Sequence, residues 1–188
     1  MKNIIHVVFL GVVFSGCNGP YDHFDIDYKY TNPELEIVKL SFNEWRAATN
    51  SESADISYTD NMIIGDGVFG SEDIFRDFGA ATIQKVSIND PGYQPMIDYM
   101  QRTGINGAGI EGKLIITITE SFYNKDGEFK SDFFHAVILH ELGHFFGLMH
   151  GNGLIMNPSA NVPCIDREAL DVFCEIHEDC INPIAMCE

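Results

Sequence analysis

One eleven-residue stretch constrains this 188-residue chain more than any other part of it. Residues 140–150 read H-E-L-G-H-F-F-G-L-M-H, which is the pattern H-E-x-x-H-x-x-G-x-x-H. Residues four apart share one face of a helix, so His140 and His144 direct their imidazoles to the same side. Glu141 lies about 100° round the helix from His140. The pattern therefore predicts a helix that presents two metal-binding nitrogens with a carboxylate beside them.

A glycine and a third histidine complete the pattern. Gly147 tolerates the left-handed conformation that ends helices, so the chain can turn back there. His150 then supplies a third nitrogen, and three protein ligands leave one position for water, as in catalytic rather than structural zinc sites. The alternative is a buried helix with incidental histidines. That alternative does not explain why three histidines and a glutamate fall at ligand spacing.

The extended motif, with Met156 in the sequence I-M-N-P shortly after it, resembles the metzincin metallopeptidases, and its Met-x-Pro ending is most similar to matrixins. One departure is that Gly151 follows the third histidine, where matrixins carry a serine. The spacer to the methionine is also shorter. The resemblance implies an α+β fold of the zincin type. Its parts would be a mixed twisted sheet, a long N-terminal helix, a central active-site helix and a C-terminal helix.

The resemblance also implies roles for individual residues. The zinc ligands would be His140, His144 and His150, with Met156 as the Met-turn methionine beneath the metal. Glu141 would be the general base, taking a proton as water attacks a peptide carbonyl and giving it to the leaving nitrogen. The chain would then be a zinc endopeptidase. The competing interpretation is a non-catalytic zinc-binding surface module, for which the Glu141 carboxylate is not needed.

Ala136 is the candidate substrate-pocket residue. In matrixins the residue four before the first zinc-binding histidine helps line the pocket for the side chain after the cut, and Ala136 holds that place here. A small residue leaves the pocket deep, so we expect large apolar side chains after the scissile bond.

The composition and net charge of the chain limit the classes of molecule that it can bind. The net charge of −17 argues against nucleic acid and against charge-driven binding to anionic lipid. An acidic, solubilising surface is the simplest interpretation, and calcium binding by some carboxylates is the alternative. The segment Asn124–Glu128 offers oxygen ligands but lacks the full calcium-loop pattern, which favours a plain turn. We expect one catalytic domain, acting as a monomer on protein or peptide substrates.

The first residues have the pattern of an export signal. Lys2 precedes an apolar run from Ile4 to Phe14, which is too short to span a bilayer, and Ser15-Gly16-Cys17 follows. Phe14 to Cys17 resembles the lipobox of bacterial lipoproteins, which implies acylation of Cys17. The predicted parts are a signal peptide over 1–16, an anchored linker over 17–23 and the catalytic domain over 24–188. An ordinary cleaved signal of a secreted protein is the alternative.

The linker leaves few residues between Cys17 and the first predicted strand at Phe24. That length is insufficient for a folded pro-domain. We therefore expect no inhibitory pro-domain, and activity once the chain is exported, folded and loaded with zinc. The product would be a membrane-anchored lipoprotein at the cell surface or in the periplasm.

Four cysteines remain after Cys17, an even number that suggests disulfides in an exported chain. Cys164 and Cys174 flank a predicted helix over Ile165–Ile176, so they are too far apart to bond each other. Two pairings stay open: Cys174–Cys180 with Cys164–Cys187, or Cys174–Cys187 with Cys164–Cys180. A cysteine-rich zinc site is the third possibility, disfavoured by the exported context.

Periodicity predicts the remaining elements. Alternating or apolar runs predict strands over 24–30, 54–58, 82–88 and 114–119. Thr31-Asn32-Pro33 should start a helix that runs to Ala48 and buries Trp45. A helical turn is expected over 96–102. The active-site helix should be capped by Ser131 or Asp132. By resemblance, Thr82–Ile88 would be the edge strand above the active site, where an extended peptide adds alongside. His135 is expected to pack or touch solvent, not to bind metal.

Overall fold

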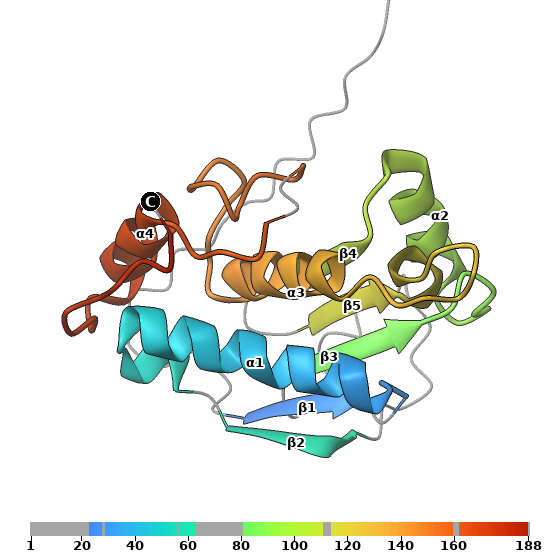
Figure 1. Ribbon diagram of the computed structural model, residues 1–188, viewed down its shortest axis with the longest axis horizontal. Coiled ribbons are helices and arrows are strands. Elements are labelled where there is room, and N and C mark those ends of the chain that lie inside the picture. The colour runs from blue at the N-terminus through green and yellow to red at the C-terminus, as the bar shows by residue number, and fades with distance from the viewer. Residues whose placement is uncertain are drawn as a thin grey trace, which may run out of the picture.

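The chain folds into a five-stranded sheet covered on one face by helices, as Figure 1 shows. The computed structural model describes residues 23–27, 29–55, 57–62, 81–110, 114–159 and 162–187. The predicted signal peptide, Cys17 and most of residues 61–71 lie outside these ranges. Within the described part, no helix combines the length and apolarity needed to cross a bilayer.

The sheet has the order β2-β1-β3-β5-β4. Its strands are β1 (His23–Asp27), β2 (Ser57–Met62), β3 (Ala81–Val86), β4 (Gly107–Ile110) and β5 (Leu114–Ile118). β4 runs antiparallel to β5 and the other pairings are parallel. A parallel pair needs a long crossover, and α1 provides it between β1 and β2. The predicted mixed sheet is confirmed.

The predicted edge position of Thr82–Ile88 is wrong. That segment contains β3, which pairs with β1 on one side and β5 on the other. The edge next to β5 is β4, which lies between the predicted helical turn over 96–102 and the strand predicted over 114–119. Alternation of apolar and polar residues reports half-burial, but it carries no information on which strands lie alongside.

Other strand limits differ by a few residues. Ala54, predicted to open the second strand, ends the short 3-10 helix η1 (Glu52–Ala54), and β2 begins at Ser57. β1 begins at His23, one residue before the predicted domain start. Such shifts are typical because side-chain patterns fix the type of an element better than its ends.

Helix α1 (Asn32–Thr49) begins where the sequence predicts. Thr31 is its N-cap, and the Thr31 backbone N–H donates to Glu34 Oε2 at 2.7 Å in a capping box. Glu34 is buried and is also bound by Lys85 Nζ of β3 at 2.7 Å. The start of α1 is thereby fixed to the sheet.

Trp45 anchors the core between α1, α3 and α4. Its side chain is fully buried, its ring stacks on Phe173 at 5.7 Å between centroids, and it contacts Phe146 at 5.5 Å. Its Nε1–H donates to the carbonyl of Leu139 at 3.1 Å. The predicted core role of Trp45 is confirmed, and it joins α1 to the residue preceding His140.

Helix α3 (Ser131–Phe145) is the predicted central helix. Lys130 holds the N-cap position, so Ser131 and Asp132 already lie in the first turn and the predicted caps are wrong. The Lys130 backbone N–H donates to the Phe122 carbonyl at 2.8 Å, and this contact with an earlier segment fixes the helix start. Four apolar residues at helical spacing on α3 are buried: Phe134, Ile138, Leu142 and Phe145.

The remaining helices are α2 (Gln94–Thr103), η2 (Thr119–Phe122) and α4 (Arg167–His177). Helix α2 contains the predicted turn over 96–102 and is longer than it at both ends. α4 is the predicted last helix and carries Asp166 as its N-cap.

Disulfides join Cys174 to Cys180 and Cys164 to Cys187, which is one of the two pairings that the sequence left open.

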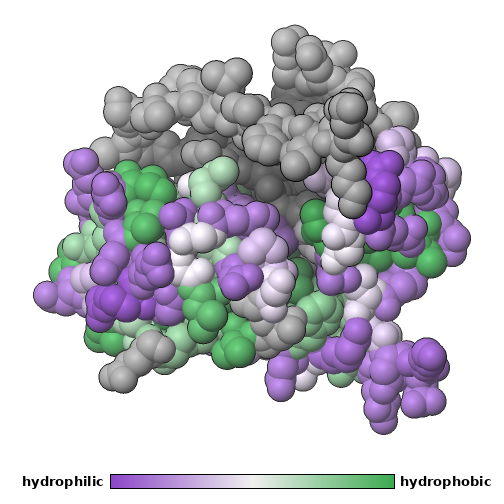
Figure 2. All heavy atoms as spheres, turned by 90° about the horizontal axis from the view of Figure 1, so that it is seen from above, coloured by the Kyte–Doolittle hydropathy of each residue, from purple (hydrophilic) through white to green (hydrophobic). Residues whose placement is uncertain are grey.

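Viewed from above in Figure 2, hydrophilic side chains cover much of the described surface, with hydrophobic ones interspersed. This surface agrees with the acidic balance of the whole chain.

In the turn at 124–128, Asn124 Oδ1 accepts from the backbone N–H groups of Asp126 and Glu128, and its Nδ2 donates to Glu128 Oε2 at 2.7 Å. The residues of this turn bind one another, as a plain turn requires.

Candidate zinc site

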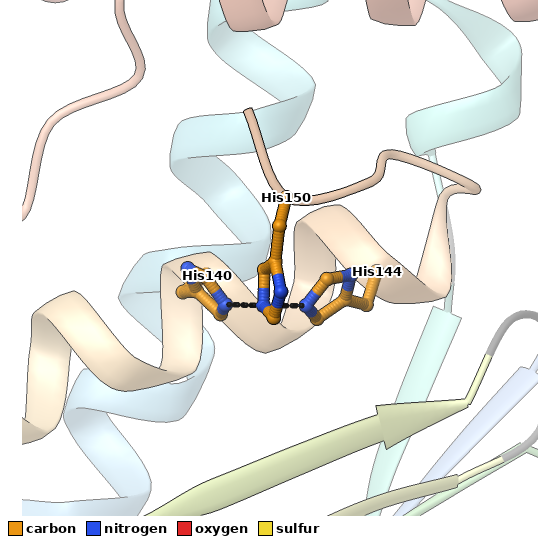
Figure 3. Close-up of side chains that lie close together, drawn as sticks. All are labelled: His140, His144 and His150. Carbon is orange, nitrogen blue, oxygen red and sulfur yellow. Dashed lines mark hydrogen bonds between the residues drawn. The ribbon is translucent and has the colours of Figure 1, made fainter. Parts of the chain in front are cut away.

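The last two turns of α3 place His140 and His144 on one side of the helix. Their ring centroids lie 4.8 Å apart, and Figure 3 shows both rings turned toward the same point. Four residues of helix bring the two side chains together, so no distant contact is needed to form this half of the site.

A loop after α3 brings His150 to the other two rings. Gly147 has a φ of +90°, the left-handed conformation predicted for it, and Leu148 N–H donates back to the Gly143 carbonyl at 2.9 Å. The chain then reverses, and His150 Nε2 lies 3.3 Å from His140 Nε2 and 3.0 Å from His144 Nε2 (Figure 3). All three predicted ligands converge.

Two backbone carbonyls determine which ring nitrogens face the centre. His140 Nδ1 donates to the Ile155 carbonyl at 2.7 Å, and His144 Nδ1 donates to the Leu148 carbonyl at 2.8 Å. A carbonyl oxygen only accepts, so each Nδ1 carries the proton and each neutral ring keeps its lone pair on Nε2. Both lone pairs point toward His150.

This donor set fits Zn²⁺. A tetrahedral zinc ion with Zn–N bonds of about 2.0–2.1 Å separates its nitrogen ligands by about 3.3 Å. The measured Nε2 separations of 3.3 and 3.0 Å approach that value. Among the described residues, this cluster is the one group of three or more histidine, cysteine or acidic side chains placed to hold a metal ion. His140, His144 and His150 are therefore placed to bind Zn²⁺.

Burial keeps these ligands neutral. It lowers the pKa of His144 to about 4, because the charged ring loses water, while the bond to Leu148 opposes the shift. Burial likewise lowers the pKa of His140 and of His150. Imidazole must be deprotonated to bind a metal, so all three are ready to bind zinc near neutral pH.

Met156, the predicted Met-turn methionine, packs against α3 at Gly143. Its side chain is fully buried, and a Cβ built on Gly143 would overlap its Sδ atom. The same Cβ would lie 3.4 Å from the ring of Trp45. Gly143 is thus a packing position that the sequence reasoning missed. Its place between Glu141 and His144 gave no sign of the methionine contact.

Glu141 is buried on α3 beside strand β4, with an exposed fraction of 5%. A Cβ built on Gly107 of β4 would lie 2.9 Å from Glu141 Oε1, 3.0 Å from its Cγ and 2.7 Å from Val137 Cγ1. Strand β4 therefore approaches the Glu141 side chain as closely as a glycine allows. The sequence reasoning did not single out Gly107.

Ala136, the predicted pocket residue, is also buried on α3.

His135 stays outside the cluster. Its Nε2 lies 2.5 Å from Glu44 Oε2 of α1, and it links the two helices. It packs, as expected, away from the three clustered histidines.

Comparison with known proteins agrees with this geometry. The profile of Peptidase family M54 matches residues 67–184, well over half of the chain. The chain belongs to peptidase family M54. M54 membership and the three-histidine cluster confirm the predicted zinc metallopeptidase. The M54 match includes all three histidines, Glu141 and three of the four C-terminal cysteines, Cys164, Cys174 and Cys180.

The fold of this M54 domain is similar to that of a solved archaemetzincin from Methanopyrus kandleri. The two share 14% sequence identity with a TM-score of 0.51, over 85% of this chain and 97% of the other. At this identity the likeness concerns the fold alone. No curated protein matches the sequence. Neither comparison shows the finer likeness to matrixins.

Proposed function

We propose that this M54 protein is an endopeptidase that cleaves peptide bonds of extracytoplasmic proteins, with Glu141 as general base. The observation that carries the proposal is the burial of Glu141, the residue that follows His140 on α3, in a chain whose three histidines converge. When bound, zinc supplies Lewis acidity toward water and a peptide carbonyl. Glu141 takes the proton of the attacking water and passes it to the leaving nitrogen.

The burial of Glu141 favours catalysis over a non-catalytic zinc-binding module. Taking a carboxyl group out of water costs free energy. Three histidines complete the protein part of the site without Glu141, so a purely structural zinc does not need a carboxylate next to His140. A general base is needed at that place for hydrolysis.

The decisive experiment compares Glu141→Gln with Glu175→Gln, which alters an exposed carboxylate on α4. Glu141→Gln should retain one zinc per chain and lose about 10²- to 10⁴-fold in turnover of a peptide substrate, because it removes a base and not a ligand. Glu175→Gln should match the unaltered protein. Full activity in Glu141→Gln would refute the mechanism, and loss of zinc would mean that Glu141 is a ligand.

We propose further that Ala136 helps to set specificity for a large apolar side chain after the scissile bond. Two apolar side chains of the loop after α3, Met149 and Leu154, are 60% and 48% exposed, which supports contact with an apolar substrate residue. Cleavage of a peptide library should show the apolar preference. Ala136→Arg should shift it to smaller residues. A library without apolar preference at that position would exclude this role.

We also propose export and anchoring through Cys17. The two disulfides support an oxidising compartment, since such bonds rarely persist in the cytosol. Cys17→Ser should release the protein from the membrane fraction, and mass spectrometry of the mature N-terminus should find a lipid on Cys17. A membrane-bound Cys17→Ser protein would contradict the anchor.

A further inference from the structure

The backbone of Ile155 connects the zinc site to a second part of the fold. Its carbonyl accepts the Nδ1–H of His140 at 2.7 Å, across 15 residues of sequence. Its own N–H donates to Asp166 Oδ2 at 2.9 Å, in a buried hydrogen bond. One residue therefore binds a zinc-ligating ring on one side and a carboxylate on the other.

Asp166 is built rigidly into the start of α4. Its other carboxylate oxygen, Oδ1, accepts from the backbone N–H groups of Glu168 at 3.1 Å and Ala169 at 3.2 Å, as an N-cap does. The residue is 7% exposed. The two oxygens thus have separate tasks: Oδ1 caps α4, and Oδ2 holds Ile155.

Neighbouring contacts fix Asp166 further. Cys164, two residues earlier, is bonded to Cys187, and Met186 N–H donates to the Ile165 carbonyl at 2.9 Å. On its other side lies Gly153, with a φ of +94°, where any Cβ would overlap Asp166 Oδ1. The carboxylate is therefore held by the C-terminal segment and packed against the loop that carries Ile155.

We propose that Asp166 is a positioning residue of the zinc site. By fixing the Ile155 backbone it orients the carbonyl that holds the His140 ring with Nε2 toward the metal. Partners that orient a metal-binding histidine typically contribute about 10- to 100-fold in metal affinity. This inference rests on the zinc site of the proposed function, but it does not require that the protein be a peptidase.

The test separates the two tasks of Asp166. Asp166→Ser retains an N-cap oxygen for α4 but is too short to hold Ile155 as well, so the metal-free variant should still fold cooperatively, with a midpoint lowered by no more than the loss of one buried hydrogen bond. Its Zn²⁺ affinity, measured by competition with a chelating dye, should fall about 10- to 100-fold. Asp171→Ser, which alters an exposed aspartate on the same helix, is the matched control and should change neither property.

A second measurement follows the rings themselves in the metal-free protein. In Asp166→Ser the Nδ1–H proton of His140 should exchange faster with solvent in NMR spectra. That of His144, held by Leu148 without Asp166, should not change. Unchanged zinc affinity, or equal changes at both histidines, would overturn the proposal. Absence of zinc in the unaltered protein would instead count against the proposed function, and the NMR comparison would still test Asp166.

Discussion

At the scale of the residue, the chemistry of the site depends on the hydrogen bonds of each imidazole. His140 and His144 are alike in sequence, yet one is oriented by the Ile155 carbonyl and the other by that of Leu148. These bonds select the tautomer, and burial suppresses protonation. Together they make each ring a pre-oriented neutral ligand.

The lowered pKa of His144 predicts how stability depends on pH. The unfolded chain takes up a proton on His144 as pH falls through its ordinary value of 6.5, whereas the folded metal-free protein does so only near pH 4. Stability should therefore be lost progressively as pH falls from about 6.5 to about 4, by roughly 1–3 kcal/mol.

Urea unfolding of chelator-treated protein at several pH values measures this effect. His144→Asn should reduce the loss within that window without removing it, because burial also lowers the pKa of His140 and of His150. Asp179 does not interfere there, because hydrogen bonds from Ser51 and Ser53 outweigh burial and hold its pKa below the ordinary 3.8. If the free energy of unfolding of His144→Asn depends on pH as strongly as that of the unaltered protein, His144 does not cause the pH dependence.

Gly107 gives a second prediction at this scale. A methyl group there would overlap Val137 and press on Glu141, so Gly107→Ala should displace the proposed base. We expect kcat to fall about 10- to 100-fold with zinc content unchanged, since a displacement near 1 Å can cost that much. Gly92→Ala, whose Cβ would meet its nearest atom at 3.4 Å, is the control. Normal kcat in Gly107→Ala would show that Glu141 tolerates the methyl group.

At the scale of elements, the site depends on how α1, α3 and the C-terminal segment are joined. Trp45 of α1 packs beneath α3, and the segment after α4 returns to the end of α1. There Ile184 N–H donates to the Ala48 carbonyl at 2.8 Å, and Asp179 accepts from Ser51 Oγ and from Ser53 N–H. The zinc-binding helix is thus held between two elements that are themselves tied together.

Asp179 tests this connection. Asp179→Ala leaves the Ser51 and Ser53 donors without their carboxylate and should destabilise the fold by about 1–2 kcal/mol at neutral pH. Because its pKa is lowered, its contribution should be full above about pH 4 and vanish as pH falls through the folded pKa. Thermal unfolding measures the loss, with Asp171→Ala as control. Equal midpoints would mean that the contact does not stabilise the fold.

At the scale of the whole molecule, two disulfides close the C-terminal segment onto the core. Cys164 and Cys187 are 23 residues apart in sequence, and Cys174 and Cys180 are six apart. Closing the longer loop removes more entropy from the unfolded chain. The longer disulfide also adjoins Asp166, so the C-terminus is coupled to the loop beneath the zinc site.

Removing the two disulfides separately should lower the free energy of unfolding by unequal amounts. Replacing Cys164 and Cys187 by serine should destabilise the protein by about 3 kcal/mol, and replacing Cys174 and Cys180 by about 2 kcal/mol, from loop length alone. Urea unfolding under oxidising conditions measures both, and a reducing agent should remove the difference between each variant and the unaltered chain. A larger loss for the shorter loop would contradict the loop-length argument.

The zinc ligands could be predicted from sequence because they are local. His140, Glu141 and His144 lie on two turns of one helix, Gly147 ends it, and His150 follows within one reversal. Helical periodicity and the conformational freedom of glycine suffice to bring these groups together. The helix start at Thr31 and the helical spacing that buries Trp45 could likewise be predicted from nearby residues, although the side chains that bury Trp45 are distant in sequence.

Contacts between distant segments were decided only by the tertiary structure. β4 rather than β3 forms the sheet edge next to the zinc-binding helix, Gly107 reaches Glu141, and Asp166 reaches Ile155. The four C-terminal cysteines allowed two pairings, and the packing of the returning segment formed one of them. A local pattern records which face of an element is buried. The partner of that face is chosen by the free energy of the whole packed chain, in which each contact depends on the others.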